Sequence, residues 1–556
     1  MPKPLYAKNL RQAFAVDGLT LADGVDALRD QQLEALQWAA ENEEYPYLLV
    51  NAPTGSGKTL LLATYGASFH KQSWTYTVHT IALQNQVAGT FTNLPVLTGR
   101  RNHPCLIGRE THGMPITADQ AICAAGQWCE YKGRGLPKDP DEVMEAAYAR
   151  HSAAVRDGSE PMRCDYYEQR SQALSKSHRV TNYAMFLSDG SLVRDNTTTT
   201  LLADEAHNIE DAVCNKAEFQ LFAPSYRRFG IDLPGCATLV EWAEWARNVR
   251  GKLPPVRGGR EKPDFGLITV REQVNTLAEF TEFDEPDWIF YPNDKGVMFQ
   301  PVWGRTFVRP QLLRHFEDFY EEDGVQRAML TSATLMGGDY VADLLGLPEG
   351  SWAYLDLPST FPPENRPVNY APVVRMNKDR MATAEGRLPM QQALDKMIGL
   401  YLSAGKTSGI IHAVSNRYRD NILTESRFRG ILTSDRETHK AAVERGEASF
   451  VVAANMSEGW DGVDDLCRVV LMPKVPHPNL GDPRIRARMD QDPRSYDYKT
   501  LVAVVQGAGR GVRHKTDTAD TWILDESWGR LYAKRKEWLP KSFVDAYRHR
   551  VPLPYE

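Results

Sequence analysis

With 556 residues, the chain has room for about three or four domains. Its 42% hydrophobic and 25% charged residues are ordinary for a globular protein, and no apolar run is long enough to cross a membrane. The formal net charge of −7 excludes a uniformly basic surface but not a local basic groove for nucleic acid. No signal-peptide core is present, so we expect a cytoplasmic protein, associated with the nucleoid or acting in an infected host cell.

The first predicted helix begins near residues 28–33, where apolar residues start to recur at helical spacing. A glutamine at this distance upstream of a phosphate loop can present its amide to adenine. Taken alone the signal is weak, because a glutamine on a helix is usually only solvated.

Residues 51–59 (N-A-P-T-G-S-G-K-T) lie between an apolar run at 47–50 and another at 60–63. This strand, glycine-rich turn and helix are the context that a phosphate-binding loop requires. The two glycines allow backbone angles closed to other residues, so that successive N–H groups can surround a phosphate, and the helix start favours an anion. Lys58 would neutralise the β- and γ-phosphates, and the Thr59 hydroxyl would ligate Mg²⁺. The sequence predicts a nucleoside triphosphate site whose loop residues are Thr54, Gly55, Ser56, Gly57, Lys58 and Thr59.

A strand is predicted at 74–80, followed by a polar turn at 80–86 that opens a second helix. Thr80 and Gln84 would lie at the carboxyl edge of the sheet, where ligands bind in open α/β folds. A capped helix start without a ligand explains the segment equally well.

Four of the seven cysteines fall close together in the chain, separated by 17, 5 and 34 residues. Zinc prefers closely paired thiolates, which are missing here, whereas an iron–sulfur cluster accepts irregular spacing. Spacing alone leaves a cluster, a zinc site and four unrelated thiols open. The candidate ligands are Cys105, Cys123, Cys129 and Cys164.

A helix start is predicted at 180–186, and a threonine-rich strand at 197–202 leads into A-D-E-A-H. Two carboxylates at the end of a strand, downstream of a phosphate loop, suit nucleotide hydrolysis. Asp204 would hold the Mg²⁺ shell, and Glu205 would orient the attacking water. The alternative is a surface helix start.

Residues 214–323 are rich in Pro, Trp and charged residues and contain no phosphate motif. Their basic stretch at 247–262 is a candidate loop that faces a nucleic-acid strand, and a solvated flexible loop is the alternative. Sheet-like sequence resumes at 325–330, before the hydroxyl-rich T-S-A-T-L at 331–335.

Residues 355–367 are proline-rich and predict a linker, after which helices and strands alternate again. An apolar helix face is predicted over 394–402, with strands at 409–414, 450–454, 469–472 and 521–524. This half has no phosphate loop, but it carries S-E-G-W-D at 457–461 and Q-G-A-G-R-G-V-R at 506–513. On a helix, Arg510 and Arg513 would share one face, as an arginine finger requires.

Taken in order, these blocks resemble superfamily 2 helicases of the XPD/DinG type. The matching positions are Arg29, Gln32 and residues 51–59, 80–86, 204–207, 331–334, 457–461 and 506–513. The cysteine quartet between the second and third blocks, and the insertion at 214–323, narrow the resemblance to this branch. Trp460, the short chain, the long gap before Cys164 and the loosely matching P-S-T-F at 358–361 depart from the family pattern.

The resemblance implies an α/β fold with two RecA-like P-loop motor domains and two insertions in the first. The expected boundaries are 1–95, 179–213 and 323–365 for the first motor domain with its linker, 96–178 for an iron–sulfur domain, 214–322 for an arch-like domain, and 366–556 for the second motor domain.

The resemblance also implies an ATP-dependent 5′-to-3′ DNA helicase that uses ATP, Mg²⁺ and a 4Fe–4S cluster on the four cysteines. Its expected partners are single-stranded DNA and forked or 5′-overhang duplexes, and we expect a monomer without membrane contact. An ATP-gated clamp that does not unwind, or an RNA helicase, is the alternative.

The family pattern assigns roles to residues at the matching positions. Catalysis falls to Lys58, Asp204, Glu205, Gln506, Arg510 and Arg513, and further nucleotide contacts to Arg29, Gln32, Glu458, Gly459 and Asp461. The expected DNA contacts are Thr80, Gln84, Asn182, Tyr183 and Ser415.

Overall fold

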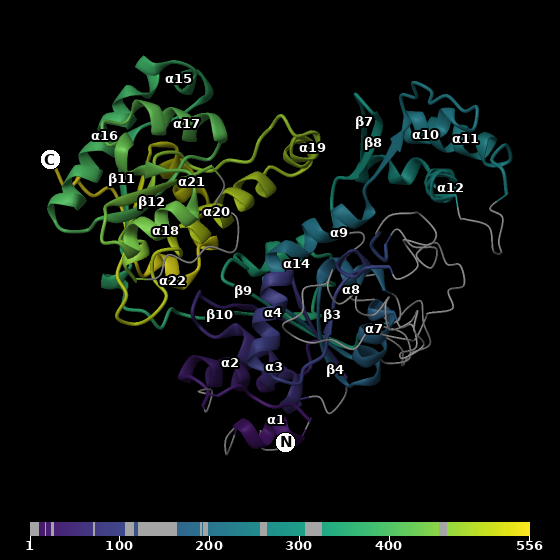
Figure 1. The fold of residues 1–556 in the computed structure, drawn as a ribbon, viewed down its shortest axis with the longest axis horizontal. Helices are drawn as coiled ribbons and strands as arrows, with labels where there is room; N and C mark the ends of the chain where they lie inside the picture. The colour runs from purple at the N-terminus through teal and green to yellow at the C-terminus, as the bar shows by residue number, and fades with distance from the viewer. Residues whose placement is uncertain are drawn as a thin grey trace, which may run out of the picture. The chain divides into compact units, whose positions relative to one another are not determined.

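A computed structural model describes residues 10–16, 18–23, 27–69, 73–105, 116–119, 164–189, 192, 198–255, 264–305, 325–454 and 464–555 (Figure 1). Five predicted site residues lie outside these ranges: Cys123, Cys129, Glu458, Gly459 and Asp461. The chain divides into two compact units. The first comprises Met1–Ala27, Leu62–Leu330 and Asp343–Ser351, and the second comprises Leu28–Leu61, Thr331–Ala342 and Trp352–Glu556.

A seven-stranded sheet with the order β10-β1-β9-β5-β2-β4-β3 is formed from the first two thirds of the chain. The strand pairs are parallel where their register is described, and the strands between the two edges are largely buried, which explains their continuous apolar or threonine-rich sequences. The strands are β1 (Tyr47–Asn51), β2 (Trp74–Val78), β3 (Val96–Leu97), β4 (His178–Asn182), β5 (Thr200–Ala203), β9 (Arg327–Ser332) and β10 (Trp352–Asp356).

The helices that accompany these strands include two that begin directly after a predicted site, α3 (Lys58–Phe69) and α4 (Ile81–Thr90). The helix predicted at 180–186 begins later than expected, because residues up to Asn182 pair in β4. The other helices are α1 (Leu10–Val16), α2 (Asp30–Glu41), α7 (Asp165–Ser175), α8 (Tyr183–Ser188), α9 (Ile209–Ala217) and α14 (Gly338–Leu344), with short 3₁₀ helices η2 (Arg100–Asn102) and η6 (Ala206–Asn208).

Within the compositionally distinct segment, an antiparallel sheet of the order β6-β8-β7 packs with three helices (Figure 1). Trp242 and Phe299 are buried in their shared core. The elements are β6 (Phe219–Phe222), β7 (Trp288–Asn293), β8 (Gly296–Pro301), α10 (Ala223–Arg227), α11 (Leu239–Arg250), α12 (Phe265–Ala278) and η7 (Glu282–Asp287).

The predicted basic loop at 247–262 is partly wrong, since Arg247 and Arg250 belong to α11. Apolar residues at helical spacing bury one face of this helix. Arg247 donates to the carbonyl oxygen of Ala278 at 3.0 Å and so ties α11 to α12.

The second unit contains another seven-stranded sheet, of the order β13-β14-β12-β15-β16-β11-β17, again with parallel pairs. Its core receives Leu394, Met397, Ile398 and Tyr401 from α16 (Ala384–Ser403), which confirms the predicted apolar helix face. The strands are β11 (Val368–Val374), β12 (Ser408–His412), β13 (Leu432–Thr433), β14 (Ser449–Ala453), β15 (Val469–Met472), β16 (Asp520–Asp525) and β17 (Tyr547–Arg548).

The predicted strands of this half therefore exist, with ends shifted by a residue or two. The helices are α15 (Lys378–Ala382), α16 (Ala384–Ser403), α17 (Asn416–Glu425), α18 (Arg436–Glu444), α19 (Pro483–Gln491), α20 (Arg494–Ala508), α21 (Ser527–Arg535) and α22 (Lys541–Val544), with η9 (Pro363–Asn365), η10 (Arg429–Ile431), η11 (Asp464–Leu466) and η12 (Lys536–Trp538). No helix of the described residues is long and apolar enough to span a bilayer.

Candidate nucleotide site and strand-facing residues

The loop between β1 and α3 has the geometry expected of a phosphate cradle. Gly55 and Gly57 have φ angles of 78° and 79°, which favour glycine. Lys58 and Thr59 form the first turn of α3, where the positive end of the helix favours an anion. The buried Ser56 hydroxyl has no hydrogen-bond partner within the described part of the chain, so its oxygen can bond a ligand. These residues fit a nucleotide phosphate with its Mg²⁺.

Arg29 and Gln32 hold this loop from the side of α2. The Gln32 amide donates to the carbonyl oxygen of Gly57 at 2.8 Å and accepts from the backbone N–H of Arg29 at 2.7 Å. The Arg29 guanidinium donates to the carbonyl oxygen of Gly55. Both ends of the Gln32 amide are engaged, so in this conformation Gln32 supports the loop instead of facing a base. A Cβ atom on Gly57 would lie 2.5 Å from the Gln32 Nε2. This close approach is a second reason, besides the φ angle, why the position requires glycine.

Asp204 and Glu205 follow the carboxyl end of β5 and are held differently. The buried Asp204 carboxylate accepts from the Tyr76 hydroxyl at 3.0 Å and from the Glu205 N–H at 2.9 Å. Glu205 has a left-handed backbone, with φ 50° and ψ 45°, which costs on the order of 1 to 3 kcal/mol for a residue with a Cβ. Its carboxylate lies 3.4 Å from Nδ1 of His207. A fixed carboxylate beside one on a strained backbone suits metal holding and water orientation. The sequence carried no signal for the role of Tyr76.

Three of the five residues predicted to contact DNA are N-caps of helices, and they lie at the ends of β-strands. Thr80 accepts from the N–H of Leu83 at 3.3 Å, Asn182 from that of Met185 at 2.9 Å, and Ser415 from that of Tyr418 at 3.3 Å. Backbone N–H groups at such helix starts are ready donors to phosphate. All three side chains cap a helix in the structure, which was the alternative for Thr80. A capping side chain does not prevent the helix start from contacting a phosphate.

The other two predicted strand contacts, Gln84 and Tyr183, are corrected by the structure. Gln84 is fully buried and donates to the carbonyl oxygens of Leu97 at 2.8 Å and Val180 at 3.2 Å. Tyr183 is 1% exposed, and its hydroxyl donates to the carbonyl oxygen of Asp204 at 2.6 Å. Neither side chain can stack on or bond to a DNA strand in this conformation, because both brace the sheet edge.

The expectation that Arg510 and Arg513 share a helical face is also wrong. Helix α20 carries Gln506 but ends at Ala508, with Gly509 as its C-cap, because glycine favours helix ends over helix interiors. The segment beyond it nevertheless approaches the phosphate loop within the second unit. The Thr54 hydroxyl lies 3.5 Å from the position of a Cβ on Gly509, and the carbonyl oxygen of Arg513 lies 3.4 Å from a Cβ on Gly55.

Asp517 fixes the turn that carries Arg513. It is buried, accepts from the N–H of Arg513 at 3.0 Å and pairs with Arg468 at 3.0 Å. Asp517 also lies near Asp464 and His514, which bond to each other at 2.7 Å. These existing partners indicate an internal brace for the arginine segment.

His412 ends β12 in a buried position, and neither ring nitrogen has a hydrogen-bond partner within the described part of the chain. Burial, together with the charge of Arg510, lowers the pKa of His412 to about 3. The His412 imidazole is therefore neutral at neutral pH and does not repel Arg510.

Cys105 and Cys164 are both buried, and the chain segments that bear them are tied together. Nδ1 of His103 lies 2.5 Å from Oδ2 of Asp165, and its Nε2 lies 2.8 Å from the Thr98 hydroxyl. Two thiols on converging segments fit the two ends of a four-cysteine cluster site. The other two thiols lie outside the described residues, so the ligand set stays a prediction.

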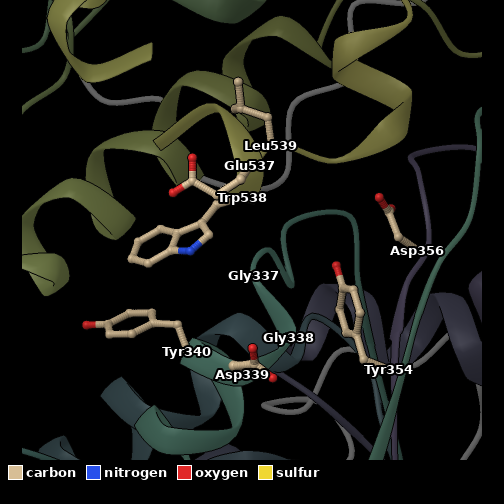
Figure 2. Close-up of a pocket in the computed structure, with 9 residues that line it drawn as sticks. All are labelled: Gly337, Gly338, Asp339, Tyr340, Tyr354, Asp356, Glu537, Trp538 and Leu539. Carbon is tan, nitrogen blue, oxygen red and sulfur yellow. The ribbon is translucent and has the colours of Figure 1, made fainter. Parts of the chain in front are cut away.

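A hollow of about 300 Å³ lies elsewhere in the second unit and contains none of the predicted site residues (Figure 2). Trp538 stacks on Tyr340 along one side, with ring centroids 4.9 Å apart. On another side, burial raises the pKa of Asp356, which accepts from Asn51 at 2.8 Å. The hollow thus borders the strand that leads into the phosphate loop.

Comparisons with known proteins agree with these features. A family model for the helicase C-terminal domain matches residues 394–545. The ATP-dependent DNA helicase chl-1 of Caenorhabditis elegans is 31% identical over 140 residues, and the ATP-dependent DNA helicase DDX11 of Mus musculus is 31% identical over 105 residues. These matches cover 24% and 16% of this chain but only 17% and 12% of the relatives, so the chain matches a small part of their length.

Solved XPD helicases have the same fold over nearly the whole chain. One XPD helicase structure has a TM-score of 0.59 at 16% identity and covers 94% of this chain and 99% of its own. The structure of Xpd4 from S. tokodaii has a TM-score of 0.53 at 14% identity and covers 94% and 100%. The predicted α/β fold and the resemblance to the XPD/DinG type are thereby confirmed: residues 394–545 match a helicase C-terminal domain, and the fold is similar to that of the solved XPD structures.

Proposed function

We propose that the protein is an ATP-dependent DNA helicase that moves 5′ to 3′ along single-stranded DNA. The observation that carries the proposal is the phosphate loop, which α2 braces on one side and the arginine segment approaches on another. This arrangement supports ATP turnover that requires the arginine segment to lie close to the phosphate loop.

Different residues are assigned different roles in ATP hydrolysis. Lys58 would neutralise phosphate charge, and Thr59 and Asp204 would hold Mg²⁺, which would supply positive charge to the phosphate oxygens. Glu205 orients and polarises the attacking water, while Gln506, Arg510 and Arg513 stabilise charge on the γ-phosphoryl group. Glu458, Gly459 and Asp461 belong to this set by family resemblance.

The capped helix starts at Thr80, Asn182 and Ser415 offer backbone donors to DNA phosphates. Contacts of this kind track a strand without reading its sequence, as a translocating motor requires. Cys105, Cys123, Cys129 and Cys164 would hold a 4Fe–4S cluster.

The test is strand displacement on duplexes with a 5′ or a 3′ single-stranded tail, made of DNA or of RNA, with Lys58→Ala as the inactive control. We expect ATP-dependent displacement only of the 5′-tailed DNA. ATP turnover without displacement would indicate the clamp, displacement of RNA would indicate an RNA helicase, and displacement from a 3′ tail would reverse the polarity.

A further inference from the structure

The segment that joins β10 to β11 crosses the phosphate loop, and its first half is anchored there. The N–H of Leu357 donates to the carbonyl oxygen of Asn51 at 3.0 Å, directly before the loop. The Gln31 side chain of α2 donates to the carbonyl oxygen of Pro358 at 2.6 Å. The linker therefore leaves the first sheet fixed to the same elements that shape the nucleotide site.

The second half of the linker is anchored to the other sheet of the second unit. Asn365 donates to the carbonyl oxygen of Lys515 at 2.9 Å and accepts from the N–H of Ala519 at 3.0 Å. The Arg366 guanidinium donates to the carbonyl oxygen of Ser542 and, at 3.0 Å, to that of Phe361. Phe361 thus stands between two anchored ends.

The Phe361 side chain touches both the loop and the arginine segment. It is 6% exposed and clusters with Val512 and Ala519, so one side of the ring packs beside the residue that precedes Arg513. The other side faces the α-carbon of Gly55, because a Cβ placed there would meet Cζ of the ring and lie 2.9 Å from its Cε2. Gly55 is therefore required both by its φ angle and by the ring.

We propose that Phe361 is a positioning residue that sets the distance between the phosphate loop and the Arg510–Arg513 segment. This inference rests on the proposed ATP hydrolysis and adds a residue that the catalytic blocks do not include. An aromatic ring is a rigid spacer in a close-packed interior, so its width fixes how near the arginines come to the loop. Because the ring packs against the α-carbon of Gly55, we expect it to govern the approach of the arginines more than the affinity for nucleotide.

Removal of the ring should lower the rate at saturating ATP and DNA. A misplacement of about 1 Å at a catalytic group costs about 10²-fold in rate, so Phe361→Ala is expected to lower kcat by about 10- to 100-fold. Affinity for a fluorescent ATP analogue should change by less than about 3-fold, since the contacts that bind nucleotide equally in the ground state and the transition state remain. Phe361→Leu, which retains bulk and folds more safely, should recover part of the rate.

Phe361→Tyr is the sharper variant, because the added oxygen on Cζ points at Gly55. Phe361→Tyr should weaken nucleotide binding as well as lower the rate, whereas Phe361→Ala should lower the rate alone. The control is Phe428→Ala, because Phe428 is a partly buried phenylalanine of the second unit that packs against a different core, and this variant should keep kcat near normal. Unfolding midpoints of all variants separate lost stability from lost positioning.

Two kinetic outcomes overturn the proposal. They are a normal kcat in both Phe361→Ala and Phe361→Leu, or a raised KM with unchanged kcat. Hydrogen exchange supplies a readout that needs no ATPase: Phe361→Ala should speed exchange at residues 54–57 and 509–513 together, and unchanged exchange there would also overturn it. If the wild-type protein hydrolysed no ATP, the proposed function would fail while the exchange result still decided whether the ring couples the two segments.

Discussion

At the scale of single residues, the two carboxylates after β5 have different constraints. Asp204 is buried with hydrogen bonds to both oxygens, and Glu205 keeps a left-handed backbone. Strain at a non-glycine residue persists where the surrounding structure over-determines it, which is common at catalytic sites. Glu205 therefore has the features of a residue retained for chemistry at some cost in stability.

Glu205→Gln and Lys58→Ala should both abolish ATP turnover, but in different ways. Glu205→Gln keeps the side-chain shape and removes the carboxylate that orients water, so kcat should fall by about 10²-fold or more while ATP still binds. Lys58→Ala removes charge from the phosphate site and should weaken binding itself. Equilibrium binding of a fluorescent ATP analogue beside steady-state ATPase rates checks both, and a near-normal rate for Glu205→Gln would refute its role.

At the scale of elements, the end of α20 determines what the arginines can do. Because the helix stops at Ala508, Arg513 lies in a turn that Asp517 fixes, and it is this turn that packs beside Phe361. The finger hypothesis therefore no longer depends on a shared helical face, and depends instead on the closeness of the turn to the phosphate loop.

Arg513→Ala should lower DNA-stimulated ATP hydrolysis far more than DNA affinity, by about 10³-fold in rate. ATPase rates over a DNA titration at two salt concentrations measure both quantities, with Arg530→Ala on the exposed side of α21 as a matched loss of one charge. If saturating DNA restored the normal maximal rate, Arg513 would be a backbone contact, since lost phosphate contacts weaken affinity and its salt dependence.

The two segments that bear Cys105 and Cys164 form the other informative pair of elements. Protein purified without oxygen should be brown, with iron and sulfide at about four per chain. Cys105→Ser or Cys164→Ser should lose the colour, whereas the half-buried Cys236, in the matched Cys236→Ser control, should be dispensable, as should Cys214 and Cys467. Metal analysis and visible absorbance check this, and stoichiometric zinc without absorbance would contradict the cluster.

At the scale of the whole molecule, a net charge of −7 means that no uniformly basic surface would hold the proposed DNA strand. Helix starts would supply local binding groups instead, because each offers oriented N–H groups and a positive helix end. Thr80, Asn182 and Ser415 place such starts after β2, β4 and β12, at carboxyl ends of strands in both seven-stranded sheets.

The sequence by itself determined the features that depend on neighbours along the chain. The phosphate loop, the strand before Asp204 and the apolar face of α16 follow from short-range spacing, because backbone angles, helix starts and periodic burial are local properties. The order of these local blocks was also enough to predict the fold class.

Only the tertiary structure decided which polar and aromatic side chains are free to act. The buried Gln84 hydrogen-bonds to Val180, which is 96 residues away, and the buried Tyr183 hydrogen-bonds to Asp204. Neither side chain could therefore be recognised as internal from the residues next to it in the sequence. Phe361 lies in a proline-rich linker whose P-S-T-F only loosely matches the family pattern, yet it packs between Gly55 and Val512. Burial and packing are set by segments that meet only when the chain folds, and that is why the sequence could not supply them.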